Sequence, residues 1–213
     1  MSDIKKGNNI LAIGAHPDDI EYGCGGTIVK HLELGDRVFA LILTKGEKGG
    51  HPEDEEECLN SLKTLGINES DIFFGDFPDS SLSNDYKVVK FVEDCIIKNN
   101  INKVYTHYPE DRHQDHRNCS KSVSSAARKV SELLLYQGPS TSDPFEPHYF
   151  VEIFPRHLEK KIKSLSYYQS QIKKGIINLE TVNGFALVNG NKGNVKYAEA
   201  FALNHVTKEG EDV

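Results

Sequence analysis

The sequence lacks the features that would place the protein in a membrane or on a nucleic acid. None of its apolar runs is long enough to cross a bilayer. Residues 1–6 lead into the first apolar run without the hydrophobic segment of a signal peptide. The 25 basic residues are scattered and outnumbered by 32 acidic ones, which leaves a net charge of −7 and no basic patch for nucleic acid. We therefore expect a cytoplasmic protein with no integral membrane segment and no nucleic-acid partner.

Cysteine is scarce, and its spacing excludes a CxxC metal or redox motif. Each of the four cysteines falls at an apolar position of an expected helix, so we expect reduced side chains that pack as small hydrophobes. They are Cys24, Cys58, Cys95 and Cys119. The 213 residues contain no internal repeat and no low-complexity tract. This length is typical of one well-buried domain.

Apolar runs of strand length alternate with helical patterns through the first two thirds of the chain. The runs are 10–15, 38–43, 72–74 and 104–107. The helical patterns cover about 21–34, 53–65, 86–98 and 119–130. Alternation of this kind predicts right-handed βαβ units and an α/β fold with a doubly wound, mostly parallel, Rossmann-like sheet. In such sheets the active site lies at the carboxyl ends of the strands.

The pattern weakens after about Leu133. Residues 138–144 are typical of a turn-rich loop. Beyond it we expect a strand near 149–154, a helix from about 156 to 172, and strand-like segments near 185–188 and 197–203. We assign all of them to one domain, residues 1–205, followed by a mobile C-terminal tail, residues 206–213.

Two short clusters of histidine and aspartate follow the first and fourth expected strands. They are His16-Pro17-Asp18-Asp19 and His113-Gln114-Asp115-His116. A histidine and a carboxylate from the first turn, with one histidine from the second, would supply three protein ligands and leave a fourth position for water. That layout is typical of catalytic zinc. The remaining acidic residues would then lie beside the water, although spacing alone leaves open whether Asp18 or Asp19 binds the metal.

The same residues resemble a known family. Residues 15–21 match the AHPDDxE signature, and residues 113–116 match the HxDH signature, of the LmbE-like (PIG-L) zinc-dependent de-N-acetylases. These enzymes remove acetyl groups from N-acetylglucosamine-containing substrates. Weaker similarities, in family order, lie at 44–49, 77–79, 170–171 and 197–201. One position departs from the family, because Tyr168 stands where a histidine is frequent.

The resemblance implies one Zn²⁺ per chain with three protein ligands, His16, Asp19 and His116. It also implies that Asp18 is the general base. His113, supported by Asp115, would stabilise the oxyanion or protonate the leaving amine. This division of roles suits amide hydrolysis, which needs an activated water, a base and a proton for the amine.

Three further polar residues have competing interpretations. Arg112 is a candidate to bind a substrate hydroxyl or phosphate, but an exposed ion pair with a neighbouring carboxylate explains it equally well. Glu47 is a candidate to bind substrate hydroxyls, or else a solvated loop charge. For His107 we favour an ordinary hydrogen-bonded or surface histidine.

The sequence therefore predicts a zinc-dependent hydrolase that releases acetate from a small-molecule N-acetyl-sugar conjugate. Residues 23–26 lack the GxGxxG spacing of a dinucleotide site, which we reject. Two alternatives remain: a metallohydrolase of another class, such as a phosphoesterase with two metals, and a non-catalytic sugar- or metal-binding protein. The family resemblance also allows a homo-oligomer.

Overall fold

Seven strands of the described residues form one sheet in the order β3-β2-β1-β4-β5-β7-β6. The computed structural model describes residues 7–48, 55–142 and 145–207. The strands are β1 (Asn9–Gly14), β2 (Arg37–Thr44), β3 (Ile72–Phe77), β4 (Lys103–His107), β5 (Glu132–Tyr136), β6 (Tyr149–Glu152) and β7 (Ala198–Val206). Strands β1 to β5 run parallel, and β7 and β6 complete the sheet in antiparallel pairing. The predicted mostly parallel sheet is confirmed.

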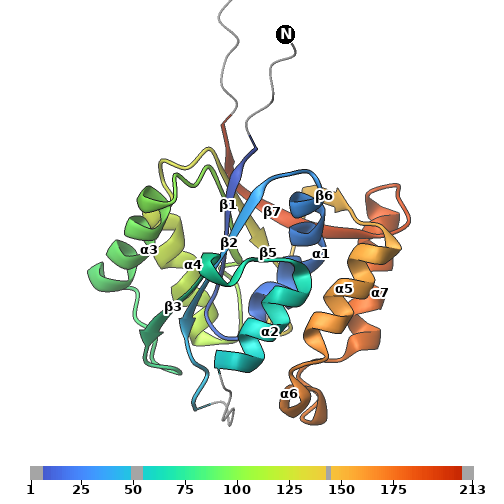
Figure 1. Ribbon diagram of the computed structural model, residues 1–213, viewed down its shortest axis with the longest axis horizontal. Helices are drawn as coiled ribbons and strands as arrows, with labels where there is room; N and C mark the ends of the chain where they lie inside the picture. The colour runs from blue at the N-terminus through green and yellow to red at the C-terminus, as the bar shows by residue number, and fades with distance from the viewer. Residues whose placement is uncertain (1–6, 49–54, 143–144, 208–213) are drawn as a thin grey trace, which may run out of the picture.

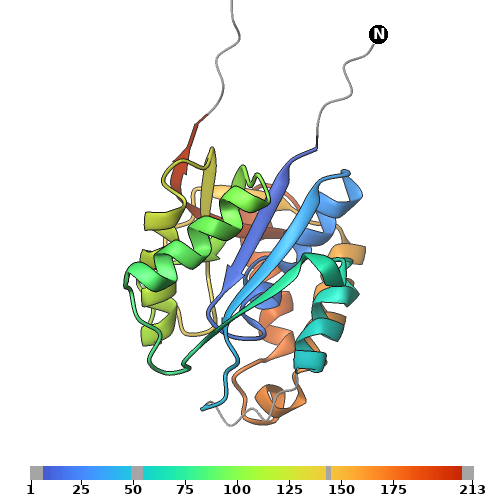
Figure 2. The same ribbon diagram turned by 60° about the vertical axis from the view of Figure 1, so that its left-hand side comes forward.

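Helices cover both faces of this sheet (Figures 1 and 2). They are α1 (Asp19–Glu33), α2 (Glu55–Leu65), α3 (Tyr86–Lys98), α4 (Gln114–Ala126), α5 (Pro155–Leu165), α6 (Gln169–Lys173) and α7 (Leu179–Lys192), with a short 3-10 turn at Glu69–Asp71. Helices α3 and α4 lie on one face, and α1, α2 and α5 lie on the other. Because β2 is covered on both faces, Phe39 and Leu41 enter one core while Ala40 and Ile42 enter the other.

The order of the strands creates a switch point between β1 and β4. From β1 the chain builds outward through β2 to β3, then returns to place β4 on the other side of β1. The pairing of Ala12 with Tyr105 shows that β1 and β4 are direct neighbours. The loops that follow these two strands therefore leave the same edge of the sheet side by side, which is where open α/β sheets bind ligands.

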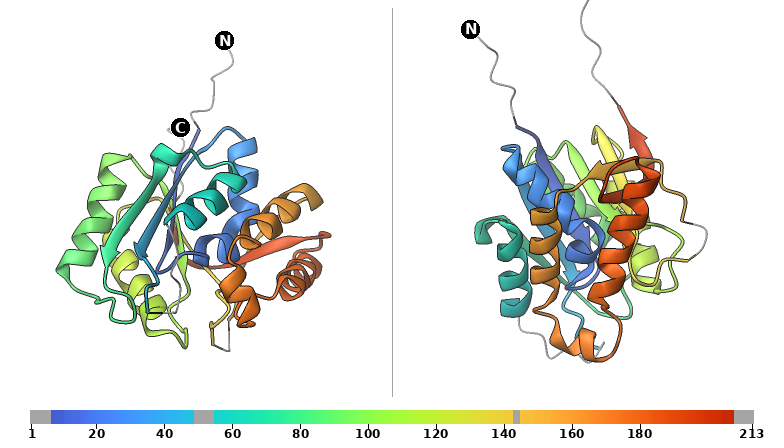
Figure 3. Two further views of the ribbon diagram at one scale, coloured as in Figure 1. Left: turned by 60° about the horizontal axis from the view of Figure 1, so that its bottom comes forward. Right: turned by 90° about the vertical axis from the view of Figure 1, so that its right-hand side faces the viewer.

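The C-terminal third joins the same sheet, but two of its elements differ from the prediction. The prediction of a strand-like segment at 185–188 is wrong, because these residues lie within helix α7. The single helix expected over about 156–172 is two helices, α5 and α6, separated by residues 166–168. The right-hand view of Figure 3 shows α5 and α7 side by side, with α6 beyond their lower ends.

Of two strands in this region, one was predicted from the sequence and the other was not. The expected segment at 197–203 is confirmed as β7, which pairs with both β5 and β6. Strand β5 was not predicted. The preceding helix ends at Ala126, before the end of the helical pattern expected over 119–130, and the chain turns back into the sheet at Glu132. Residue Val206 belongs to β7, and residues 208–213, most of the predicted tail, lie outside the described residues.

The cysteines are reduced, as expected. All four cysteines are free, and Cys24, Cys58 and Cys119 are buried. In the part of the chain that the structure describes, no helix combines the length and the apolar character that crossing a membrane requires.

Helix α1 is interrupted at Cys24, and a carboxylate from β7 caps the helical segment that follows. Cys24 has a non-helical backbone, with φ −144°. Glu199 accepts the buried N–H groups of Gly26 at 3.0 Å and Thr27 at 2.6 Å, so it caps the second half of the helix. Lys161 of α5 lies 2.5 Å from the same carboxylate, and both side chains are buried. The pair therefore joins α1, α5 and β7.

We expect Lys161→Met to destabilise the protein by about 3 kcal/mol, because it leaves a buried carboxylate without its cation. The two backbone N–H groups still donate to Glu199 in this variant. The expected loss of unfolding free energy is therefore at the low end of the range for breaking a buried ion pair. Urea unfolding of the purified protein measures the change. The matched control is Lys160→Met, on the exposed side of the same helix. Equal unfolding midpoints for the two variants would contradict this role for Lys161.

Candidate active site

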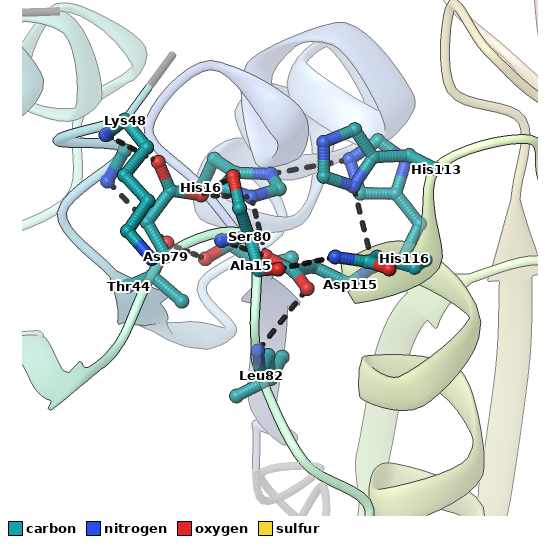
Figure 4. Close-up of polar contacts among 12 residues, drawn as sticks. Ala15, His16, Thr44, Lys48, Asp79, Ser80, Leu82, His113, Asp115 and His116 are labelled. Carbon is teal, nitrogen blue, oxygen red and sulfur yellow. Dashed lines mark hydrogen bonds and ion pairs between the residues drawn. The ribbon is translucent and has the colours of Figure 1, made fainter.

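The two predicted clusters meet at the carboxyl ends of β1 and β4. His16, Asp18 and Asp19 follow β1 and enter α1, while His113 caps α4 and His116 lies in its first turn. All five line one cavity of ≈ 450 Å³. Figure 4 shows His16 between the loop that carries Asp79 and the histidines of α4.

Side-chain atoms of three residues in this cavity lie at the spacing of metal ligands. His16 Nδ1 lies 3.2 Å from His116 Nε2, which lies 3.3 Å from Asp19 Oδ1. His16 Nδ1 is 3.5 Å from the other Asp19 oxygen. A tetrahedral zinc site with bonds of about 2.0–2.1 Å places its ligand atoms about 3.3–3.4 Å apart. The three residues therefore fit three corners of such a site.

Two carboxylates set the orientation of His16. Its Nε2 lies 3.2 Å from Asp79 Oδ1 and 3.3 Å from Asp115 Oδ2 (Figure 4). A proton on Nε2 leaves the lone pair of Nδ1 facing the other two ligand atoms, as second partners do for metal-binding histidines. Burial alone would lower the pKa of His16, but hydrogen bonds to the carboxylates of Asp115, Asp19 and Asp79 hold it well above its usual value.

His116 is oriented in the same way by Asp111, a residue that the sequence analysis missed. Asp111 Oδ1 lies 3.2 Å from His116 Nδ1, which leaves Nε2 free to bind a cation. The carboxylate is held by the backbone N–H of His113 at 2.8 Å and the hydroxyl of Ser140 at 2.6 Å. Although burial opposes it, Asp19 and Asp111 raise the pKa of His116 to about 9.

His107 also belongs to this site, contrary to the interpretation from sequence. It is fully buried, and its ring stacks on that of His116 with centroids 4.1 Å apart. Its Nε2 lies 3.1 Å from Asp19 Oδ2, the oxygen that also accepts the N–H of His16 at 2.7 Å. Burial and the neighbouring His116 lower the pKa of His107 to about 4, so the ring is neutral, and its Nε2 also accepts the backbone N–H of Ala15 at 3.2 Å. The other oxygen of Asp19 remains directed at His116.

Asp18 occupies an uncommon backbone conformation beside these residues. Its φ is 86°, in the left-handed region that aspartate tolerates better than most residues. It is partly buried and lines the cavity. Burial, followed by the negative charges of Asp19 and Glu21, raises the pKa of Asp18 well above its usual value. A carboxylate with a raised pKa in a cleft is typical of acid–base chemistry.

His113 is held as a hydrogen-bond donor. The backbone N–H of Asp115 donates to His113 Nδ1 at 3.2 Å, so the neutral ring carries its proton on Nε2. Burial and the positive charges of His116 and His16 lower the pKa of His113, which favours that neutral form. The ring centroid lies 4.7 Å from that of His16.

The Asp115 carboxylate lies elsewhere than the sequence analysis expected. It accepts the backbone N–H groups of Ser80 at 2.7 Å and Leu82 at 3.1 Å, and it approaches His16 (Figure 4). The support that Asp115 gives to His113 thus comes from its backbone, while its side chain connects the 80–82 loop to His16.

The two predicted substrate-binding residues lie outside the cavity lining. Arg112 is exposed, and its backbone N–H donates to Ser140 O at 3.0 Å. Glu47 is exposed as well, and its carboxylate accepts the N–H of Asp79 at 3.3 Å. Among the described residues that line the cavity, neither side chain is present.

Tyr168, which departs from the family pattern, is fully buried beneath the site. Its hydroxyl donates to Glu21 at 2.7 Å, and the hydroxyl of Ser61 donates to the same oxygen at 2.6 Å. Burial raises the pKa of Glu21, and these two hydroxyls partly oppose the rise. Glu21 is therefore a buried anchor of the first turns of α1.

Comparison with known proteins gives the family of the chain. Residues 11–127 match the PIG-L family model, described as GlcNAc-PI de-N-acetylase. The chain is 35% identical to the uncharacterized deacetylase YaiS of Escherichia coli (strain K12), over 80% of this chain and 95% of that protein. It is 29% identical to diacetylchitobiose deacetylase of Thermococcus kodakarensis, over 93% and 83% of the two chains.

A solved structure shares the fold. The N,N'-diacetylchitobiose deacetylase of Pyrococcus horikoshii superposes with a TM-score of 0.81 at 23% identity, covering 95% of this chain and 88% of that one. The family match, the relatives and the fold agree, and the chain belongs to the PIG-L (LmbE-like) family of deacetylases.

Proposed function

We propose that this protein is a zinc-dependent hydrolase that removes the acetyl group from an N-acetylated sugar. The observation that carries the proposal is the close spacing of His16 Nδ1, His116 Nε2 and the Asp19 carboxylate in a cavity that Asp18 also lines. The reaction consumes one water, breaks the acetyl C–N bond, and yields acetate and the free amine. The relative named diacetylchitobiose deacetylase supports an acetylated sugar as the substrate class.

His16, Asp19 and His116 would hold the cation, with Asp79, Asp111 and Asp115 orienting the two histidines. A bound zinc would supply a Lewis acid that lowers the pKa of water to about 7 and polarises the amide carbonyl. Two nitrogens and one oxygen are common zinc donors, and three protein ligands leave a position open for chemistry.

Asp18 is the proposed general base. It takes a proton from the attacking water and then gives it to the nitrogen of the collapsing tetrahedral intermediate, because an amine leaves only when it is protonated. Burial and neighbouring carboxylates raise the pKa of Asp18 above its usual value, the direction expected for a carboxylate that both accepts and returns a proton.

His113 is the proposed oxyanion donor. Since the N–H of Asp115 occupies Nδ1, a second proton on the ring would face another donor, so the neutral ring with Nε2–H is favoured. A neutral imidazole can stabilise developing negative charge by donating this hydrogen bond. Of the two roles that the family resemblance allows, the geometry supports the oxyanion role, with the proton for the amine coming from Asp18.

We expect His113→Ala to retain zinc and to lower kcat by about 10²-fold, the low end of what removing one oxyanion donor costs. His113→Gln keeps a side-chain N–H and should recover part of the rate. Steady-state kinetics on an N-acetylated sugar, together with bound zinc per chain, measure both effects. Loss of zinc in the alanine variant would mean that the roles of His113 and His116 are exchanged.

The proposed function itself is tested by product analysis. The purified protein, with zinc, is incubated with a neutral oligosaccharide of N-acetylglucosamine, and the released acetate and free amine are both quantified. We expect equal amounts of the two products. A chelator should abolish acetate release, and added zinc should restore it. A phosphorylated sugar tests the phosphoesterase alternative, and release of phosphate without acetate would overturn the proposal. Binding of sugar without turnover would instead indicate a non-catalytic protein.

A further inference from the structure

The outer wall of the cavity carries no fixed charge. It comprises the three lining residues that are exposed, Pro139, Gly175 and Ile176. The inner end contains the histidines together with the carboxylates of Asp18, Asp19 and Asp79. Among the described lining residues there is no lysine or arginine. The fixed side-chain charges of this cavity are therefore acidic groups and histidines at its metal end.

The most apolar part of the outer wall is Ile176, which is 48% exposed. Its turn is anchored, because the N–H groups of Ile176 and Ile177 both donate to Gln171 O, at 3.0 and 3.3 Å. Gly175 has φ +73°, a conformation that favours glycine, and Ile177 is buried in a cluster with Tyr168. The structure thus presents Ile176 as a fixed apolar surface over the mouth of the cavity.

An anionic substituent would be poorly accommodated against this wall. Arginine and lysine are the side chains that proteins use most to bind phosphate and carboxylate groups, and a charge desolvated without a partner is costly. The basic residues Lys48, Arg112 and Lys174 adjoin the site along the chain, but they are exposed and outside the lining. At such positions solvent and salt screen their charges.

We propose that the substrate is an uncharged glycoside of an N-acetylated amino sugar, with the group remote from the acetamide packing against Ile176 and Pro139. This inference rests on the proposed deacetylase function and narrows its substrate class. It disfavours conjugates in which phosphate, a nucleotide or a carboxylate occupies the outer part of the cavity. An apolar or sugar aglycone, in contrast, buries surface there without leaving a charge unpaired.

A matched pair of probes tests the inference. The methyl α-glycoside of N-acetylglucosamine and N-acetylglucosamine α-1-phosphate carry the same acetamide and differ in the charge of the aglycone. Acetate release is measured for both at one ionic strength, and bound zinc is checked after each assay so that chelation by phosphate is excluded. We expect kcat/KM for the neutral probe to exceed that for the phosphate by at least about tenfold.

Substitution of Ile176 then tests the position of the aglycone. Ile176→Lys adds a cation to the outer wall and should raise the ratio of phosphate to neutral kcat/KM by about tenfold, whereas the uncharged control Ile176→Gln should not. An unchanged ratio in the lysine variant would overturn the contact with Ile176. Equal or faster release from the phosphate by the wild type would overturn the uncharged substrate while leaving deacetylation intact. No acetate from either probe would count against the proposed function itself.

Discussion

His116→Ala is expected to reduce bound zinc from near one per chain to near zero and to lower the deacetylation rate by at least about 10³-fold. The lost rate corresponds to the several kcal/mol that a metal ion contributes to stabilising charge in a hydrolytic transition state. His116 is only 4% exposed and supplies one of three converging ligand atoms. Without it, His16 and Asp19 would leave a two-ligand site open to water.

The measurement is elemental analysis of protein that has been loaded with zinc and then dialysed. His148→Ala is the matched control, because His148 is an exposed histidine outside the cavity lining. Thermal unfolding of each variant separates loss of metal from loss of fold. Zinc near one in His116→Ala would mean that the two clusters do not share a metal, and the hydrolase interpretation would lose its basis.

The number of zinc ions bound per wild-type chain decides a further question. His16, Asp79 and Asp115 form a further group of side chains that could hold a metal ion, with ligand atoms within 4.8 Å of one another. We interpret this group as support for His16. A ratio near two would instead place a second cation there and favour the two-metal chemistry typical of many phosphoesterases.

The parallel half of the fold was predictable because its strands are buried on both faces. In β2, residues 38–44 are all buried, so the strand has to be a continuous apolar run, and such a run is visible in the sequence. The polar clusters were visible for the complementary reason, since His16 and His113 follow such runs at the same edge of the sheet. Chemistry and topology therefore pointed to one place.

Helix α7 shows why the C-terminal third was harder to predict. Residues 185–188 are four apolar residues in succession, and so short a run does not distinguish a strand from a helix. The helical period lies in Val182, Ala186 and Gly190, which are buried four residues apart. Gly190 is a weak hydrophobic signal, yet it has to be small because a Cβ there would lie 2.4 Å from Lys196 O.

The supporting residues of the site depend on contacts that no local pattern reveals. Asp111 reaches His116 because its loop bridges to Thr141, far along the chain. Ile176 reaches the cavity because α6 lies at the carboxyl edge of the sheet, beyond a helix break that neither proline nor glycine marks. His107 looked ordinary because its partner, Asp19, is 88 residues away.

Asp18→Asn is expected to retain zinc and to lower kcat by about 10³–10⁴-fold with little change in KM, in the upper part of the range for an acid–base group. The effect should be large because one carboxylate serves both proton transfers. Asparagine matches aspartate in shape and tolerates the left-handed backbone, with φ 86°, so the local fold should survive. What is lost is the ability to accept the proton of the attacking water.

Asp76→Asn is a close control for this substitution, because Asp76 is also an aspartate in the left-handed region, with φ 53°. Its carboxylate is exposed and pairs with Lys45 outside the cavity lining. Wild-type turnover in Asp76→Asn would show that the change of aspartate to asparagine in this conformation is harmless by itself. An unchanged rate in Asp18→Asn would remove Asp18 as the base. Loss of zinc in that variant would instead make Asp18 a metal ligand and reopen the choice between the two adjacent aspartates, which spacing in the sequence leaves undecided.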